Sequence, residues 1–176
     1  MSNVPASGRS FERIARADLE RLAGIATEDR EDRFARKPHW RGVYGDRAIA
    51  VALCQGAALH YLDDKTGVQD FDVWTFYAEV PETPFPPRWR LERDFGDPKF
   101  GQSLDKPQFV GRRVDCIGRS ISAMTNEDPA AAVRRYLRTG RTESARFLAK
   151  KAVVLLSPTE RLGEVVWPMG AVAPAV

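Results

Sequence analysis

The segment from residue 67 to 80 constrains the fold more than any other part of the chain, because it is dense in β-branched and aromatic side chains that favour strands. Within it, Asp70 and Asp72 alternate with apolar residues, so a strand would point both carboxylates to one face. A second apolar run, residues 109 to 117, carries Asp115 in the same kind of setting. The sequence therefore predicts two core strands whose three carboxylates can converge on one face.

Such a trio predicts a metal site. Carboxylate oxygens are hard ligands that suit Mg²⁺ or Mn²⁺ beside a substrate phosphate, and two such ions can clamp the attacking and leaving oxygens of an in-line displacement. The alternative is that Asp70 and Asp72 lie on a solvated strand face and that Asp115 is unrelated to them. The apolar neighbours of all three residues favour the metal site, because an unpaired buried carboxylate is costly.

The length and composition indicate a globular protein. A chain of 176 residues fits a single domain, residues 1 to 176, and its 43% hydrophobic and 29% charged residues are ordinary for a soluble protein. No apolar run reaches the length of a membrane span and the N-terminus lacks a signal-peptide pattern, so we expect a cytoplasmic protein without a membrane partner. Cys54 and Cys116 lack the spacing of a zinc site or a redox pair, and we expect buried thiols.

The charge is mixed rather than strongly basic. With 27 basic and 24 acidic residues the formal net charge is +3, which is weak support for a nucleic-acid partner. The densest group of cations is expected to form a solvated helix face. It consists of Arg134, Arg135, Arg138, Arg141 and Arg146.

The rest of the chain predicts helices around these strands. Whether the first helix continues through the charged residues 28 to 37, and whether residues 48 to 54 form a strand or a buried helix, stays open. The expected elements are a helix over 11–26, a loop or short hairpin over 39–46, a turn at Gly56 into a helix through Leu62, an irregular excursion over 81–107, helices over 129–137 and over 143–155, and a short apolar piece at 165–167.

Together these elements predict an α+β fold, in which a mixed sheet of about four or five strands is flanked by helices. The core of the domain is expected over about residues 46 to 118 and a C-terminal helical part over about residues 126 to 158.

The order of these motifs resembles the nucleotidyltransferase superfamily related to DNA polymerase beta. That superfamily combines a strand, a glycine-containing turn and a helix with a strand that carries two alternating carboxylates and a neighbouring strand that carries a third. Within it, Gln55-Gly56-Ala57-Ala58-Leu59 is similar to the Gly-Gly-x-Ala-Leu of an uncharacterised bacterial group near the abortive-infection toxin nucleotidyltransferases. The resemblance covers roughly residues 48 to 118.

The resemblance implies Mg²⁺-dependent transfer of a nucleoside monophosphate from a nucleoside triphosphate to a hydroxyl of a small molecule, a protein or an RNA. Asp70 and Asp72 would bind both metal ions (Mg²⁺ or Mn²⁺), and Asp115 would bind the catalytic ion and help to activate the attacking hydroxyl. The residues that would bind the nucleoside triphosphate are Gln55, Gly56, Ala57, Lys65 and Arg113.

The chain departs from the family pattern at the glycine turn. Gln55 replaces one glycine of the pair, and Ala57 follows Gly56 where the family usually has Gly or Ser. Val68 stands where a serine commonly precedes the carboxylates of the toxin-like group. These departures favour a weak or narrowly selective enzyme, or alternatively a nucleotide- or partner-binding module of the same fold, linked to a toxin–antitoxin system. A third interpretation is an α+β domain in which the three acids have no common function.

Overall fold

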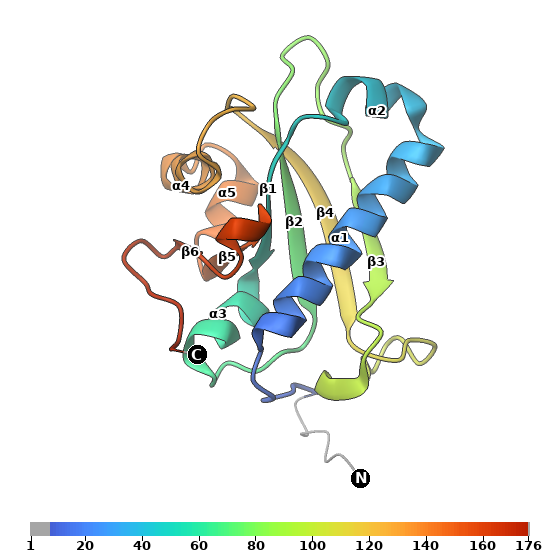
Figure 1. The fold of residues 1–176 in the computed structure, drawn as a ribbon, viewed down its shortest axis with the longest axis vertical. Helices are drawn as coiled ribbons and strands as arrows, with labels where there is room; N and C mark the ends of the chain where they lie inside the picture. Colours follow the sequence, from blue (N-terminus) through green and yellow to red (C-terminus); the bar gives the residue numbers. More distant parts are fainter. Residues whose placement is uncertain (1–7, 176) are drawn as a thin grey trace.

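The computed structural model describes residues 8–175, which form a six-stranded mixed sheet with helices on both faces (Figure 1). The strands are β1 (Ala48–Cys54), β2 (Phe71–Ala78), β3 (Arg90–Asp94), β4 (Arg113–Ile121), β5 (Ala152–Ser157) and β6 (Val165–Trp167). Their order is β3-β4-β2-β1-β5-β6, with β2 and β4 parallel and the other neighbours antiparallel. The predicted α+β class with a mixed sheet is confirmed.

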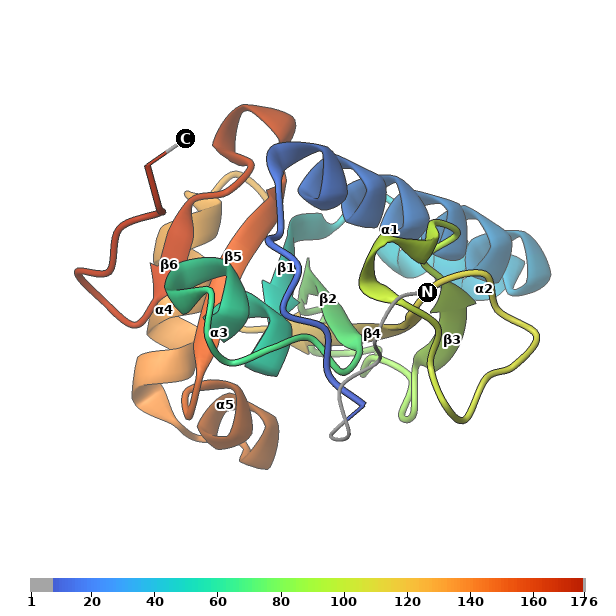
Figure 2. The ribbon, with the colours of Figure 1, turned by 90° about the horizontal axis from the view of Figure 1, so that it is seen from below.

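Helices cover the two faces unequally. The α-helices are α1 (Arg16–Arg36), α2 (Pro38–Tyr44), α3 (Gln55–Asp63), α4 (Pro129–Thr139) and α5 (Glu143–Leu148), and the short 3-10 helices are η1 (Pro98–Phe100) and η2 (Thr159–Arg161). α1 crosses one face of the sheet, whereas α4 and α5 lie on the opposite face (Figure 2). α4 contacts β1 and β6, so this second face is covered mainly on the β1, β5 and β6 side.

Each face has its own hydrophobic core. Under α1, Leu22 and Ala26 pack in one buried cluster with Val73 and Cys116 of the central strands. On the other face, a second cluster contains the side chains that β1, β2 and β4 share with α4 and α5: Ala52, Trp74, Phe76, Ile121, Val133, Leu137 and Leu148. Because successive strand residues alternate between these two clusters, the register decides which side chains reach which face.

The first helix begins later than the sequence predicts. α1 begins at Arg16 rather than at residue 11, because Ser10 pairs through its backbone with Val68 in an isolated bridge. The carboxylate of Asp18 instead accepts a hydrogen bond from the backbone N–H of Ala15 at 2.7 Å, which stabilises the helix start. The charged residues 28 to 36 belong to the same helix, which ends at Arg36.

Three predicted elements are wrong. Residues 39 to 46 were predicted as a loop or hairpin, but residues 38 to 44 form the helix α2. Pro38 is compatible with the first turn of this helix, because a backbone N–H there would make no helical hydrogen bond. The excursion over 81–107 contains β3, which pairs with β4 along the edge of the sheet. The C-terminal part is helical only to Leu148, since Ala152–Ser157 forms the strand β5 between β1 and β6.

Other predicted boundaries shift or are confirmed. The second core strand, β4, begins at Arg113 rather than 109 and continues through Gly118. α4 begins at Pro129 as predicted, where the carboxylate of Asp128 accepts from Ala131 N–H at 2.8 Å, and it ends at Thr139, where Gly140 closes the helix at φ +54°. Within residues 8–175 we find no helix with the length and apolar character that crossing a membrane requires.

Candidate functional site

The uncovered half of the second sheet face is the floor of a cleft of about 1150 Å³. Side chains from β2, β3 and β4 form this floor. α5 provides one wall, and the proline-rich segment over residues 79–89 provides another. Asp70, Asp72 and Asp115 all line this cleft.

The sheet register brings the three acids to one face. Asp72 of β2 and Asp115 of β4 are direct partners in the parallel ladder. Asp70 lies two positions before Asp72 and immediately before β2, so strand alternation sends it to the same side. Among residues 8–175, no three His, Cys, Asp or Glu side chains are positioned to hold a metal ion as they stand, so the metal site stays a prediction.

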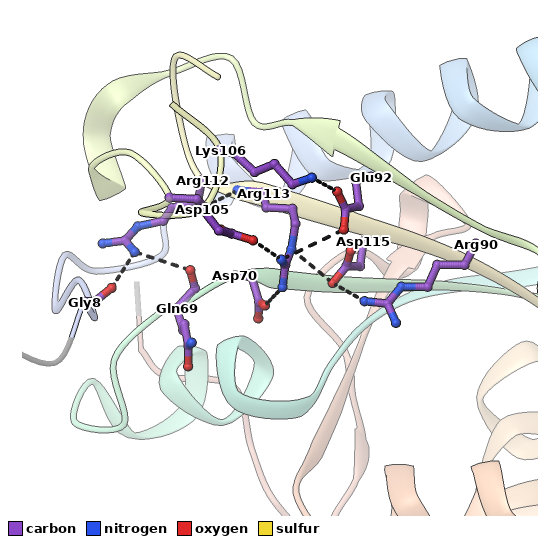
Figure 3. Close-up of polar contacts among 11 residues, drawn as sticks. Gly8, Gln69, Asp70, Arg90, Glu92, Asp105, Lys106, Arg112, Arg113 and Asp115 are labelled. Atoms are coloured by element: carbon purple, nitrogen blue, oxygen red, sulfur yellow. Dashed lines mark hydrogen bonds and ion pairs between the residues drawn. The ribbon is translucent and has the colours of Figure 1, made fainter. Parts of the chain in front are cut away.

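The guanidinium of Arg113 lies between the acids (Figure 3). Its Nη2 is 2.5 Å from Asp70 Oδ2 and its Nε is 3.4 Å from Asp115 Oδ2. Arg113 was predicted to contact a triphosphate, but in the structure it pairs with carboxylates of the same cleft. Because Arg113 precedes Asp115 by two residues on β4, the alternation that aligned the acids also placed this cation among them.

Burial and like charge perturb two of the acids. Asp115 is 1% exposed, and burial raises the pKa of its carboxyl. Its Oδ2 accepts from Arg90 Nη2 at 3.0 Å, whereas Oδ1 has no hydrogen-bond partner among the described residues. For Asp72, burial and then the charges of Asp70 and Asp115 raise the pKa to about 7. An unpartnered carboxylate oxygen and crowded negative charge fit the demands of a divalent cation.

Glu92 is a further acid of the site that sequence reasoning missed. It is the register partner of Asp115 on the edge strand β3, so a row of side chains runs from Glu92 through Asp115 to Asp72. Its carboxylate is paired with Lys106, and its pKa is lowered mainly by that hydrogen bond. The sequence contained one signal for this strand, the charged residues Arg90 and Glu92 at alternate positions. It was missed because the segment around them is rich in proline and was predicted to be irregular.

The glycine turn lies next to the acids but does not itself line the cleft. Cys54, the last residue of β1, is the register partner of Asp72, and α3 begins at the next residue. At Gly56 an added Cβ would lie 3.8 Å from the Nζ of Lys151, so the ammonium of Lys151 lies beside the start of the helix.

Gln55 occupies a backbone conformation that suits glycine. Its φ is +61°, a left-handed value that side chains with a Cβ rarely adopt. The side chain is buried, and its amide donates to Phe147 O at 3.4 Å, linking the start of α3 to α5. Ala57 is buried in the core under α1. Lys65 is exposed beyond the C-terminal end of α3, and none of these three predicted nucleotide contacts is among the cleft-lining residues.

Arg112 supports the approach to β2. Although it is 2% exposed, it has only backbone carbonyls as hydrogen-bond partners among the described residues. Its guanidinium donates to Phe100 O at 2.6 Å, to Gly8 O at 2.5 Å and to Gln69 O at 3.4 Å. These contacts hold three distant segments together immediately before Asp70 (Figure 3).

Comparison of the chain with models of known protein families, with curated proteins and with solved structures gave no match. Any functional assignment therefore depends on the geometry of the cleft and on the motifs themselves.

Proposed function

We propose that this protein is a divalent-metal-dependent nucleotidyltransferase that moves a nucleoside monophosphate from a nucleoside triphosphate to a hydroxyl acceptor. The observation that supports the proposal best is the register of the sheet. It aligns Asp72 with Asp115 in one cleft, with Asp70 beside them and the glycine turn of α3 adjacent. This is the arrangement that the motif order predicts.

Asp70, Asp72 and Asp115 would hold Mg²⁺ or Mn²⁺. When bound, such an ion neutralises phosphate charge and lowers the pKa of an attacking hydroxyl. The donor set fits this group, because Asp115 Oδ1 is buried with no hydrogen-bond partner among residues 8–175 and Asp72 resists ionisation in the absence of a counter-charge. With three acids on one floor, metal binding would relieve like-charge repulsion.

The chain's own cations would bind the phosphates. The nine-residue helix α3 begins at Gln55, and the backbone N–H groups at a helix N-terminus carry partial positive charge. Lys151 adds a full charge beside Gly56. The cleft exceeds the roughly 300 to 1,000 Å³ of typical ligand sites, so it has room for a nucleotide and part of an acceptor. The acceptor would enter between α5 and the proline-rich segment.

Two observations favour a second candidate, a module of the same fold that binds a nucleotide or a partner without turnover. Gln55 holds a strained conformation in the turn where the family has glycine. Arg113 also pairs with Asp70 and Asp115, the oxygens that catalysis would need. In such a module the acids would serve recognition, and the cleft would not need to release Arg113.

An activity assay separates the two candidates. The full chain is incubated with α-labelled nucleoside triphosphates, Mg²⁺ or Mn²⁺ and a cell extract that supplies acceptors. We expect label on a macromolecule or small molecule, lost in Asp72→Ala and kept in Asp46→Ala, a control at an exposed acid. Nucleotide binding without label would support the module. Label that survives Asp72→Ala would contradict the proposed site.

A further inference from the structure

The guanidinium of Arg113 lies within reach of four carboxylates at once (Figure 3). Its Nη2 is 2.5 Å from Asp70 Oδ2, and its Nε is 3.4 Å from Asp115 Oδ2. On its other side, Nη1 is 2.7 Å from Asp105 Oδ2 and 3.9 Å from Glu92 Oε1. One cation therefore serves two different pairs of acids.

These pairs differ in depth. The floor carboxylates are Asp70 and Asp115, whose side chains are 25% and 2% exposed. The rim carboxylates are Asp105 and Glu92, whose side chains are 58% and 34% exposed. The backbone of Arg113 is fixed, because its N–H donates to Ser103 Oγ at 2.8 Å and its Cα lies in β4. Only the side chain has freedom to change partners.

The cations of the site do not balance its acids. Five carboxylates (Asp70, Asp72, Glu92, Asp105 and Asp115) face three cations (Arg90, Lys106 and Arg113), and the charge of Asp70 also acts on the buried Arg112. When all are ionised, one negative charge remains in excess. The buried Oδ1 of Asp115, 1% exposed as a residue and lining the cleft, has no hydrogen-bond partner in the described part of the chain. The cluster therefore still demands positive charge with Arg113 in place.

We propose that Arg113 is a displaceable counter-cation of this site: it occupies the floor carboxylates until a divalent cation takes them, and the rim carboxylates then hold it. This inference rests on the proposed function, since it assumes that the floor acids are metal ligands. The oxygens that face Arg113 are those a divalent cation needs, and one oxygen lone pair cannot serve both. The double charge favours the metal once it is present.

The rim carboxylates determine how strongly Arg113 competes with a divalent cation for the floor carboxylates. A divalent cation binds only to molecules in which Arg113 has left the floor, so its apparent dissociation constant is the intrinsic one divided by the fraction of such molecules. Asp105, which already pairs with Arg113 Nη1 at 2.7 Å, would raise that fraction by holding the guanidinium once it has left the floor. In the rim position, the planar fork of Arg113 stays in the cleft, where it suits the oxygens of an incoming phosphate.

Competition predicts effects of opposite sign for two neighbouring substitutions. Arg113→Gln frees the floor carboxylates and should tighten the binding of a divalent cation. Asp105→Asn removes a rim partner, drives Arg113 onto the floor and should weaken it. If Asp105 acts through Arg113, Asp105→Asn should have little effect once Arg113 is already Gln. A purely long-range effect of charge would instead be additive in the double variant.

Mn²⁺ alone is the probe, titrated into the full chain without nucleotide at constant ionic strength and followed by the electron paramagnetic resonance signal of free Mn²⁺. For Arg113→Gln we expect about tenfold tighter binding, the scale of two partly exposed ion pairs. The matched control is Lys106→Gln, which removes the same charge from the cluster but leaves the floor carboxylates untouched, and should change the affinity by about twofold or less.

Several outcomes overturn the inference: equal or weaker Mn²⁺ binding by Arg113→Gln, equal tightening by Lys106→Gln, or full additivity in the double variant. Circular dichroism checks the fold. If Arg113→Gln does not fold, Arg113→Lys keeps the charge while its single ammonium cannot bridge both floor carboxylates, and intermediate tightening is expected. If neither the wild type nor any variant binds Mn²⁺, both the proposed function and this inference are wrong. If Mn²⁺ binding depends on Asp72 but does not change when Arg113 is replaced, only this inference is wrong.

Discussion

In the metal-free protein, replacing Asp72 with Asn should make the fold more stable. Asp72 lies partly buried in β2 beside Asp70 and Asp115, and within residues 8–175 its carboxylate has no hydrogen bond or ion pair. Burial, followed by the charges of the two neighbouring acids, raises its pKa from 3.8 to about 7. An ionised Asp72 therefore opposes folding, whereas an amide of the same shape carries no charge.

The sign and size of the effect follow from linkage. Between pH 3.8 and about pH 7 the folded state keeps a proton on Asp72 that the unfolded state has lost, so the stability contributed by this group falls as the pH rises. A difference of about three pKa units corresponds to about 4 kcal/mol. Because Asn still loses hydration on burial, we expect a gain of about 2 to 4 kcal/mol above pH 7, decreasing to about 1 kcal/mol near pH 4.5.

Urea unfolding followed by tryptophan fluorescence measures this difference in a chelating buffer at a series of pH values. Asp46→Asn, at an exposed acid, is the control and should leave the free energy of unfolding unchanged. Equal or lower stability of Asp72→Asn above pH 7 would refute the reasoning. Added Mg²⁺ should then stabilise the wild type but not the variant, by linkage to binding.

Three further substitutions test other parts of the structure. Asp29→Asn should lower the free energy of unfolding by about 3 to 5 kcal/mol in urea titrations, because a 4% exposed carboxylate pairs with Arg33 at 2.8 Å and Arg93 at 3.0 Å. Gln55→Gly should strengthen the thermal shift that Mg²⁺ and ATP produce, since glycine adopts φ +61° without strain. Asp128→Ala should lose about 1 kcal/mol in urea unfolding by removing the cap of α4.

Each of these has a result that contradicts it. Glu28→Gln, at an exposed acid of the same helix, is the control for Asp29, and an equal loss in both would remove the buried ion pairs as the cause. A weaker nucleotide shift in Gln55→Gly would mean that the amide contact to Phe147 matters more than backbone strain. Unchanged stability in Asp128→Ala would show that the hydrogen bond to the first turn is replaced by water.

The central strands could be predicted because their residues agree with the fold at every level. β-branched and aromatic side chains of β2 are buried on both faces, and the period of two placed Asp70 and Asp72 on one side. β3 could not be predicted in this way. Its sequence Arg-Leu-Glu-Arg-Asp has low strand propensity, and it is a strand because it pairs with β4 at the edge of the sheet. Glu92 was missed for the same reason.

The partners of Arg113 depend on contacts that the sequence does not encode locally. Alternation along β4 predicts that Arg113 and Asp115 share a face, but not that residues 103 to 105 return to the same place and add Ser103 and Asp105 to the cluster. The open choice at residues 48–54 is of another kind. A short apolar run fits a buried strand or a buried helix, and only its position between β2 and β5 decides; the same kind of run at 152–157 was predicted as helix and forms β5.

The position of the cleft follows from how the cleft-facing side chains change along the central strands. On β2 the sequence runs from Asp72 to Trp74 and Phe76, and on β4 from Asp115 to Ile117 and Ile121. The apolar ends are buried in the cluster with α4 and α5, whereas no helix within the described part of the chain covers the acidic ends. Covering the acids with another helix would remove several charges from water at a large cost in free energy. The sheet face is therefore open where the carboxylates lie, and a cation can offset the instability of Asp72 only at an open site of this kind.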